Sequence, residues 1–373
     1  HHHHAYYSMY LKEIFVDNFR NLKKQKLEFC EGVNLIYGLN AQGKSNLLEA
    51  IRLLSMGRSF RGSKMSELVK FDEEYFYVRG LVRSADFYEK KIEFGYKVNG
   101  NKVIKVNGNK LKSTGEILGH FLTVIFSPED IEIIKEGPSR RRKYLDACIS
   151  VIDKNYFFDL LQYNKTLSNR NSLLKKIKEE GKGEDLLEIF DEKLAEYGAR
   201  IIKVRNNYLE KLKNSMSKFL MEISNEKLEI IYLNSAGVKE VHEENLIREK
   251  LKNRLTKSLT LDLKYLSTQV GPHREDFKIL INGYDSRVYS SQGQKRTAAL
   301  CLKLSELEIL EEETGEKPVL LLDDVMSELD DNRKKYILKK LEGFQSFITH
   351  TSKSDVEGDC CFKIYDGIVD KLA

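Results

Sequence analysis

The stretch that decides the fold is Gly38-Leu39-Asn40-Ala41-Gln42-Gly43-Lys44-Ser45, which matches the pattern G-x-x-x-x-G-K-[ST]. Its glycines let backbone N–H groups wrap a phosphate at the start of a helix. Lys44 adds a positive charge for the β- and γ-phosphates, and the Ser45 hydroxyl is a ligand for Mg²⁺. The apolar run Val33–Tyr37 precedes the loop, and helical leucine spacing follows over 46–56. This context predicts a site for ATP and Mg²⁺ rather than a glycine turn beside a surface lysine; the expected contacts are Gly38, Asn40, Ala41, Gln42, Gly43, Lys44, Ser45 and Asn46.

A second half of the site is indicated by two carboxylates that follow the apolar run 319–322. Such a run is typical of a central parallel strand that is covered on both faces, and its carboxyl end lies where α/β sheets bind ligands. Asp323 is expected to hold Mg²⁺ through water. Asp324 is expected to orient or deprotonate the attacking water, so that Lys44 and Asp324 are the predicted catalytic pair. The alternative is a buried strand that ends in a solvated turn.

The segment Ser290-Ser291-Gln292-Gly293-Gln294-Lys295-Arg296 resembles the ABC signature L-S-G-G-Q-x-R. A hydroxyl and backbone N–H groups at a helix N-terminus recognise anions, so Ser291, Gly293 and Gln294 are expected to contact nucleotide. An ordinary capped helix start is the alternative. Ser327–Asp330 resembles the D-loop, and His350, after a strand-like segment, resembles the histidine that senses the γ-phosphate.

Composition limits the class of protein. The chain is 41% hydrophobic and 32% charged, and it contains no apolar run of 18 residues, so we expect no contact with a membrane. Five cysteines without a C-x-x-C pair favour reduced thiols and a cytoplasmic location. His1–Ser8 is expected to be a tag remnant, with the native start at Met9, so the expected fold begins there.

Positive charge is concentrated in one part of the chain. Residues 135–182 hold 12 Lys or Arg and 6 Asp or Glu, which gives +6 locally against +5 for the whole chain. A local basic field favours a polyanion such as DNA, although a run of charges can also pair with carboxylates on neighbouring helices. Arg20 is a candidate contact to the nucleotide. The candidate DNA contacts are Arg58, Arg61, Lys64, Arg140, Arg141, Arg142 and Lys143.

Hydrophobic periodicity gives the domain organisation. Alternation over 9–37 and 75–112, with turns at Asn99-Gly100 and Asn107-Gly108, predicts strands that include an antiparallel sheet. Residues 139–258 have helical spacing and almost no strand signal. We therefore predict the α/β class: a P-loop mixed sheet with an antiparallel β subdomain formed by 9–130 and 260–373, and an inserted all-helical lobe over 131–259.

The motif set resembles the SMC/RecF branch of ABC-type ATPases, and within it the RecF family. Beyond the motifs above, the resemblance is carried by Val16-Asp17-Asn18-Phe19-Arg20-Asn21, Gly57-Arg58-Ser59-Phe60-Arg61, Phe126-Ser127-Pro128-Glu129-Asp130, Gly137-Pro138-Ser139-Arg140-Arg141-Arg142 and Gly271-Pro272-His273-Arg274.

The resemblance implies a recombination mediator that binds duplex DNA and single-strand/double-strand junctions. It further implies an ATP-dependent head-to-tail homodimer, in which Ser291 of one chain serves the phosphate loop of the other, and work with RecR and RecO to load RecA. Two departures concern hydrolysis. Asp324 stands where the family of ABC ATPases usually has Glu, and 127–130 offers no Q-loop glutamine.

Other classes fit the residues less well. An SMC-like ATP-dependent DNA clamp or scaffold with little turnover shares the motifs, and measurable ATP turnover would separate it from an ATPase. A transporter subunit needs a coupling surface for membrane helices and a Q-loop. Kinases and GTPases lack a signature segment before the Asp323 strand, and no guanine-recognition motif is present.

Overall fold

The computed structural model describes residues 7–38, 41–84, 88–239, 243–351 and 356–372. The chain forms two compact units: the first unit comprises 1–129 and 306–373, and the second unit comprises 130–305. An α/β head accompanied by a separate helix-rich unit is therefore confirmed. Residues 260–305, which we expected with the ATPase domain, belong to the second unit, because a strand there pairs with one at 228–233.

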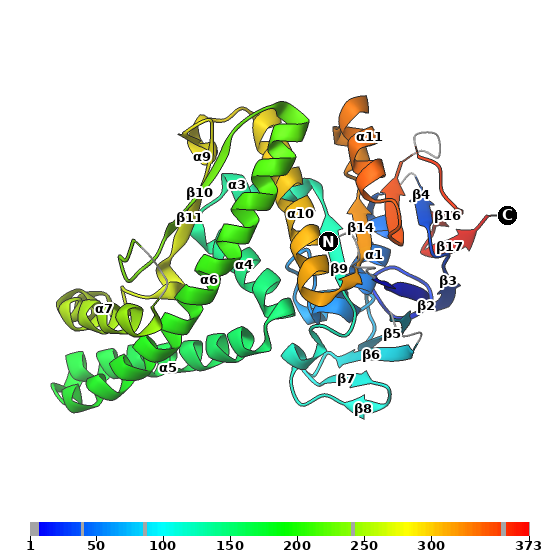
Figure 1. Ribbon diagram of the computed structural model, residues 1–373. Helices are drawn as coiled ribbons and strands as arrows, with labels where there is room; N and C mark the ends of the chain where they lie inside the picture. Colours follow the sequence, from blue (N-terminus) through cyan, green and yellow to red (C-terminus); the bar gives the residue numbers. More distant parts are fainter. Residues whose placement is uncertain (1–6, 39–40, 85–87, 240–242, 352–355, 373) are drawn as a thin grey trace. The chain divides into compact units, whose positions relative to one another are not determined.

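The central sheet of the first unit has six strands (Figure 1). In spatial order they are β17 (Ile368–Lys371), β16 (Cys360–Tyr365), β4 (Val33–Tyr37), β15 (Ser346–His350), β14 (Val319–Asp323) and β9 (Thr123–Phe126). All neighbours are parallel except β16 and β17. Every residue of β14, β15 and β9 is buried, as a parallel sheet covered on both faces requires.

A second sheet of the first unit is antiparallel throughout. Its strands are β3 (Gln25–Glu28), β2 (Tyr10–Asp17), β5 (Tyr75–Arg83), β6 (Glu89–Lys97), β7 (Lys102–Val106) and β8 (Asn109–Lys110). β5 alternates between buried and less buried positions, so one face packs on the core. Asn107 and Gly108 both have positive φ, as a tight hairpin turn requires, and the predicted antiparallel subdomain is confirmed.

Helix α1 (Ala41–Met56) contacts strands of both sheets, and its leucines are buried. The helix begins five residues earlier than the spacing predicted, inside the phosphate-loop pattern itself. The first unit also contains α2 (Met65–Leu68), α11 (Asp331–Lys340) and a short parallel pair, β1 (Tyr7–Ser8) with β13 (Glu316–Lys317).

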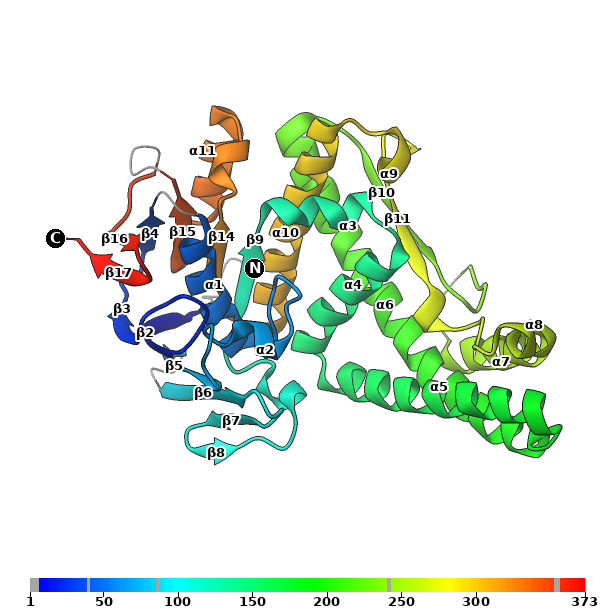
Figure 2. The ribbon, with the colours of Figure 1, turned by 180° about the vertical axis from the view of Figure 1, so that it is seen from behind.

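The second unit is mostly helical, with α5 packed on α6 and α6 on α7 (Figure 2). Its helices are α3 (Ile131–Lys135), α4 (Pro138–Ile152), α5 (Lys154–Glu180), α6 (Leu187–Ser224), α7 (Glu244–Lys257), α8 (Leu259–Tyr265), α9 (Ser286–Tyr289) and the first part of α10 (Gln292–Thr314). None of the helices in the described part of the chain is long and apolar enough to span a membrane.

The expectation of an all-helical lobe needs one correction. β10 (Leu228–Leu233) lies within 131–259 and forms an antiparallel sheet with β11 (Asp276–Ile281) and β12 (Tyr284–Asp285). The six residues of β10 directly follow the 38-residue helix α6, and they are too few to interrupt a helical pattern read over a long window.

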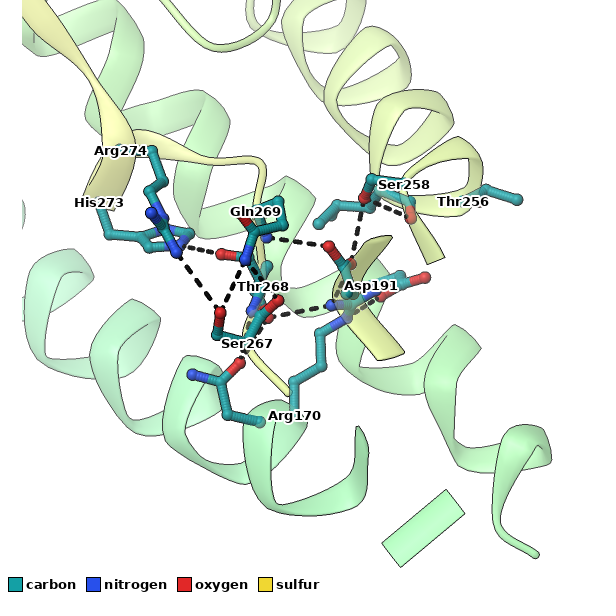
Figure 3. A network of polar contacts seen from close by, with 12 residues as sticks. Arg170, Asp191, Thr256, Ser258, Ser267, Thr268, Gln269, His273 and Arg274 are labelled. Atoms are coloured by element: carbon teal, nitrogen blue, oxygen red, sulfur yellow. Dashed lines mark hydrogen bonds and ion pairs between the residues drawn. The ribbon is translucent and has the colours of Figure 1, made fainter. Parts of the chain in front are cut away.

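A buried charge network links three helices of the second unit (Figure 3). The Arg170 guanidinium on α5 is 0% exposed. Its Nε donates to Asp191 Oδ1 on α6 at 2.7 Å, and its Nη1 donates to Asp262 Oδ2 on α8 at 2.8 Å. Nη1 also donates to Thr268 Oγ1 at 3.0 Å. The network therefore ties the segment after α8 to the two long helices.

Candidate nucleotide-binding site

The phosphate loop lies at the carboxyl end of β4 and leads directly into α1. A Cβ atom on Gly38 would lie 2.7 Å from the Ile364 carbonyl oxygen of β16, and one on Gly43 would lie 3.2 Å from Ile364 Cδ1. The two glycines therefore let the loop pass close to β16. Of the other predicted contacts, Asn40 lies outside the described residues, and the structure describes only the backbone of Ala41 and Gln42.

Lys44 is a buried cation at the start of α1, with only 2% of its surface exposed. Its Nζ donates to the backbone carbonyl oxygen of His350 at 3.0 Å. Burial lowers the pKa of Lys44, and the carboxylates of Asp324 and Asp323 only partly oppose this. A desolvated ammonium at a helix N-terminus is suited to bind a phosphate.

Ser45 and Asp323, the two predicted metal ligands, are in contact. The Ser45 hydroxyl donates to Asp323 Oδ1 at 2.9 Å, and Thr349 Oγ1 donates to the same oxygen at 3.2 Å. Burial raises the pKa of Asp323, against the lowering effect of these two hydrogen bonds. A hydroxyl and a carboxylate are the hard oxygen donors that Mg²⁺ prefers, so the pair fits the predicted cation.

β15 is the element that brings these residues together. It lies between β4 and β14, with Thr349 in register with Asp323 and His350 in register with Tyr37. Thr349 was not predicted, because nothing in a single threonine after an apolar strand distinguishes it from a core residue. His350 is buried and contributes its carbonyl to Lys44; a role for its ring toward the γ-phosphate stays a prediction.

Asp324 has a left-handed backbone with φ of 56°. Its N–H donates to Thr349 Oγ1 at 2.9 Å, and its carboxylate accepts from Ser327 Oγ at 3.3 Å. Among L-residues, Asp and Asn adopt this conformation most readily, and such residues cluster at functional sites. The geometry is compatible with the predicted role in orienting water.

Asp324→Asn is expected to bind ATP normally but to lose hydrolysis, by roughly 10²- to 10⁴-fold, because the amide keeps the shape and backbone preference without the base. Phosphate release under saturating ATP measures turnover, and a fluorescent nucleotide measures binding. The matched control is Asp72→Asn, the same change at an exposed residue of the first unit with φ of 67°. Normal turnover by Asp324→Asn would remove Asp324 from the water-activating role.

Glu49 on α1 is a site residue that the sequence did not reveal. It is 0% exposed and accepts hydrogen bonds from Arg20 Nε at 2.8 Å and Arg61 Nη2 at 2.7 Å, besides one from the Ser59 hydroxyl. Burial alone would raise the pKa of Glu49, but the hydrogen bonds from Arg20, Arg61 and Ser59 outweigh it and lower the pKa. The only available signal was a glutamate within a run of buried leucines.

Three predicted contact residues, Arg20, Arg61 and Asn46, lie close together around Glu49. Arg61 Nη2 also donates to Asn46 Oδ1, and Asn46 Nδ2 donates to Asn21 Oδ1 at 2.6 Å. Arg20, predicted to contact nucleotide, and Arg61, predicted to contact DNA, are thus both held by Glu49 in the middle of α1. Their contacts with nucleotide or DNA stay predictions.

The signature segment lies in the second unit, at the start of α10. The Ser291 N–H donates to Gln294 Oε1 at 2.8 Å, and the Gln294 N–H donates to Ser291 Oγ at 3.1 Å, so the two residues form a capping box. This is the capped start that we held as the alternative, and it does not exclude a nucleotide contact. A Cβ on Gly293 would meet only Ser291 Oγ, at 3.8 Å, so packing within the chain does not require glycine there.

The residues predicted to contact DNA differ in how far their side chains are exposed. Arg141 is corrected: it is 4% exposed, pairs with Asp276 at 2.6 Å and donates to backbone carbonyls of 133–136, so it cannot reach DNA. Arg142 is partly buried, and its Nη1 donates to the Glu275 carbonyl at 2.9 Å. Arg140 forms an ion pair with Glu132 at 3.0 Å on the surface. The exposed candidates are Arg58, Lys64 and Lys143.

Comparison with known proteins covers almost the whole chain. The family model described as RecF/RecN/SMC N terminal domain matches residues 10–365. The DNA replication and repair protein RecF of Thermoanaerobacter sp. (strain X514) is 69% identical over 363 residues, which cover 97% of this chain and 100% of that protein.

Solved structures agree with the sequence matches. A structure of the recombination mediator protein RecF-ATPrS in the RecFOR pathway is 99% identical, covers 100% of both chains and has a TM-score of 0.96. The Smc head domain of Pyrococcus furiosus, solved with the C-terminal domain of ScpA, is 17% identical with a TM-score of 0.56 and covers 98% of this chain and 96% of that one. The second likeness concerns the fold alone.

Proposed function

Because the chain belongs to the RecF family of SMC-type ATPases, we propose that it is an ATP-dependent, DNA-binding recombination mediator. It binds ATP with Mg²⁺, dimerises head to tail, and hydrolyses the nucleotide slowly. Its DNA targets are duplexes and single-strand/double-strand junctions in the cytoplasm, where it helps RecO and RecR to load RecA at single-strand gaps.

The observation that carries this proposal is the assembly around Lys44. The buried Lys44 ammonium at the start of α1 supplies a phosphate ligand, and Ser45 and Asp323 supply two cation ligands, all at the carboxyl ends of the central parallel strands. Slow hydrolysis is inferred from Asp324, whose carboxylate is one methylene shorter than glutamate and is held by Ser327.

The dimer is inferred from the signature segment. Ser291 and Gly293 offer a hydroxyl and backbone N–H groups at the start of a long helix, and the open space at Gly293 leaves room for a phosphate from another molecule. A glycine in the first turn of a helix weakens it relative to alanine by up to about 1 kcal/mol, which a contact to another chain would offset.

Mixing of two defective proteins tests the composite site. Lys44→Ala removes the positive charge of the phosphate loop, and Ser291→Arg places a bulky cation in the signature segment. Each protein alone should therefore stay monomeric in the presence of ATP. A mixed dimer has one pocket with both lesions and one with neither. ATP-dependent dimer should therefore reappear on mixing, as measured by crosslinking or light scattering.

The control is Ser168→Arg, the same substitution at an exposed serine of the second unit, which should dimerise normally. A Ser291→Arg protein that dimerises with ATP as well as the unmodified chain would contradict the head-to-tail arrangement and leave Ser291 as a helix cap only.

DNA binding should be electrostatic. The logarithm of the affinity should fall with the logarithm of salt at about −0.9 per neutralised phosphate, and several contacts would give a slope of about −4 or steeper. Arg58→Ala should reduce the slope by about 1, whereas Lys26→Ala, which removes a cation paired with Glu13, should leave it unchanged. A flat salt response would be incompatible with this DNA-binding mode.

A second candidate is an SMC-like clamp or scaffold with little turnover, which the short carboxylate at Asp324 also favours. Turnover that stays at background when DNA and ATP are both present would select this candidate over the ATPase.

A further inference from the structure

Two cysteines far apart in the sequence lie at the amino ends of neighbouring strands. Cys30 precedes β4, and Cys360 begins β16, where it is in register with Asn34. The Asn34 side chain holds Cys30 through three contacts: its Oδ1 accepts from the Cys30 N–H at 3.0 Å and lies 3.4 Å from Cys30 Sγ, and its Nδ2 donates to the Cys30 carbonyl at 2.9 Å. Facing residues of parallel strands point to the same side of a sheet, so Cys360 shares the face from which Asn34 reaches Cys30.

A second set of contacts fixes the two segments against each other. The Asp359 carboxylate accepts from the Val33 N–H at 2.7 Å, and the Asp359 N–H donates to the Val33 carbonyl at 2.8 Å. A Cβ on Gly32 would lie 2.0 Å from the Asp359 carboxylate, so only glycine allows this approach. The two chain segments that carry Cys30 and Cys360 are therefore fixed against each other.

The Cys360 side chain lies close enough to Cys30 to affect the ionisation of its thiol. Burial, followed by a hydrogen bond to Cys360, raises the pKa of Cys30 to about 12. The raised pKa keeps Cys30 in its neutral thiol form at neutral pH. Both side chains are half-buried, whereas Cys301 is buried.

We propose that Cys30 and Cys360 form an oxidation site that closes to a disulfide when the protein meets a peroxide. The Cys360 thiolate attacks one oxygen of hydrogen peroxide and the O–O bond breaks. The attacked oxygen stays on the sulfur as a sulfenic acid, and the other oxygen leaves as hydroxide, which is protonated to water. The Cys30 thiol then displaces the sulfenic hydroxyl, forming the S–S bond and releasing a second water. Two thiols are oxidised by two electrons, and one peroxide is reduced to two waters.

The position of the pair gives the disulfide a defined consequence. β16 carries Cys360 at one end and, near the other, Ile364, which packs against Gly38 and Gly43 of the phosphate loop. A bond between residues 30 and 360 ties β16 covalently to the segment leading into β4. It also closes a loop that contains most of the chain, which restricts the unfolded state and raises the melting temperature.

Peptide mapping without reductant tests the proposal. The full chain is treated with an equimolar amount of hydrogen peroxide, its remaining thiols are alkylated, and it is digested. We expect a peptide that joins Cys30 to Cys360, loss of two alkylatable thiols from the five cysteines, and reversal by dithiothreitol. The oxidised protein should melt at a higher temperature than the reduced one.

Single substitutions give the controls. Cys361→Ser should keep the cross-link and the rise in melting temperature, because Cys361 is the next residue and faces the other side of the sheet. Cys30→Ser should lose both. The proposal is overturned if Cys30 and Cys360 remain alkylatable to the same extent as Cys148, if Cys360 accumulates sulfinic acid without a cross-link, or if the cross-link uses Cys361 instead.

Discussion

Lys44→Ala is expected to abolish measurable ATP binding while leaving the nucleotide-free fold intact. The ammonium is the buried positive charge that would meet the β- and γ-phosphates, and hydrogen bonds to charged groups contribute about 1.5–3 kcal/mol each. Loss of two such bonds lowers the affinity by roughly 10²- to 10⁴-fold. Titration with a fluorescent nucleotide measures it.

Removal of the Lys44 charge alone should not lower the stability of the nucleotide-free protein. Burial lowers the pKa of Lys44, so the folded state disfavours its charge. This cost is fully present at pH values below the lowered pKa, and it disappears as the pH rises above the unfolded-state pKa. Lys44→Met, which keeps the apolar stem, should therefore melt no lower than the unmodified protein without nucleotide. Lys110→Ala, at an exposed lysine of the first unit, should change neither property. A Lys44→Met protein that is unfolded, or that still binds ATP tightly, would contradict the assignment.

Arg170→Met is expected to destabilise the second unit by about 3–5 kcal/mol, because it leaves two buried carboxylates without their cation. Asp262 is 0% exposed and would keep only neutral donors, the Gln269 N–H at 3.0 Å and the Ser258 hydroxyl at 3.1 Å (Figure 3). Burial already raises the pKa of Asp191 despite the opposing charge of Arg170. Urea unfolding followed by circular dichroism measures the loss.

Arg200→Met provides the matched comparison. Arg200 also pairs with an aspartate between α5 and α6, Asp159 at 3.1 Å, but its side chain is 33% exposed. Partly solvated pairs contribute below about 1 kcal/mol, so this variant should unfold near the unmodified protein. If the two variants lost the same free energy of unfolding, burial would not be the reason that the Arg170 network stabilises the second unit.

What the sequence could reveal depended on how far apart the interacting residues lie in the chain. The phosphate loop and the pair Asp323 and Asp324 could be predicted, because each is contiguous and follows an apolar strand. Glu49 and Thr349 could not, since their roles arise from strands and helices that meet only in the fold. The contact between Ser45 and Asp323, 278 positions apart, depends on β15 lying between β4 and β14.

Arg141 illustrates a prediction that failed for a reason visible in the sequence. Read as part of the run Arg140–Arg142, it looks like a DNA contact. Read at helical spacing, it shares a face of α4 with Leu145 and Ile149, both buried. A buried arginine needs full hydrogen bonding, and Asp276, which supplies the charged part of it, lies 135 positions away. The density of positive charge predicted that Arg141 lies on the surface, whereas the helical periodicity would have indicated that its side chain is buried.

The order of strands in the central sheet constrains how the protein is made. β4 is flanked by β15 and β16, and β9 by β14, so both strands from the amino-terminal segment pair only with strands from the carboxyl-terminal one. During synthesis β4 therefore leaves the ribosome before its partner strands exist. More than 300 further residues must be synthesised before β15 and β16 can pair with it. Such non-local pairing is slow, and an apolar strand without neighbours is prone to aggregate. The second unit, which is continuous in the chain, can fold first, and nascent chains that end before β15 should be unable to retain ATP.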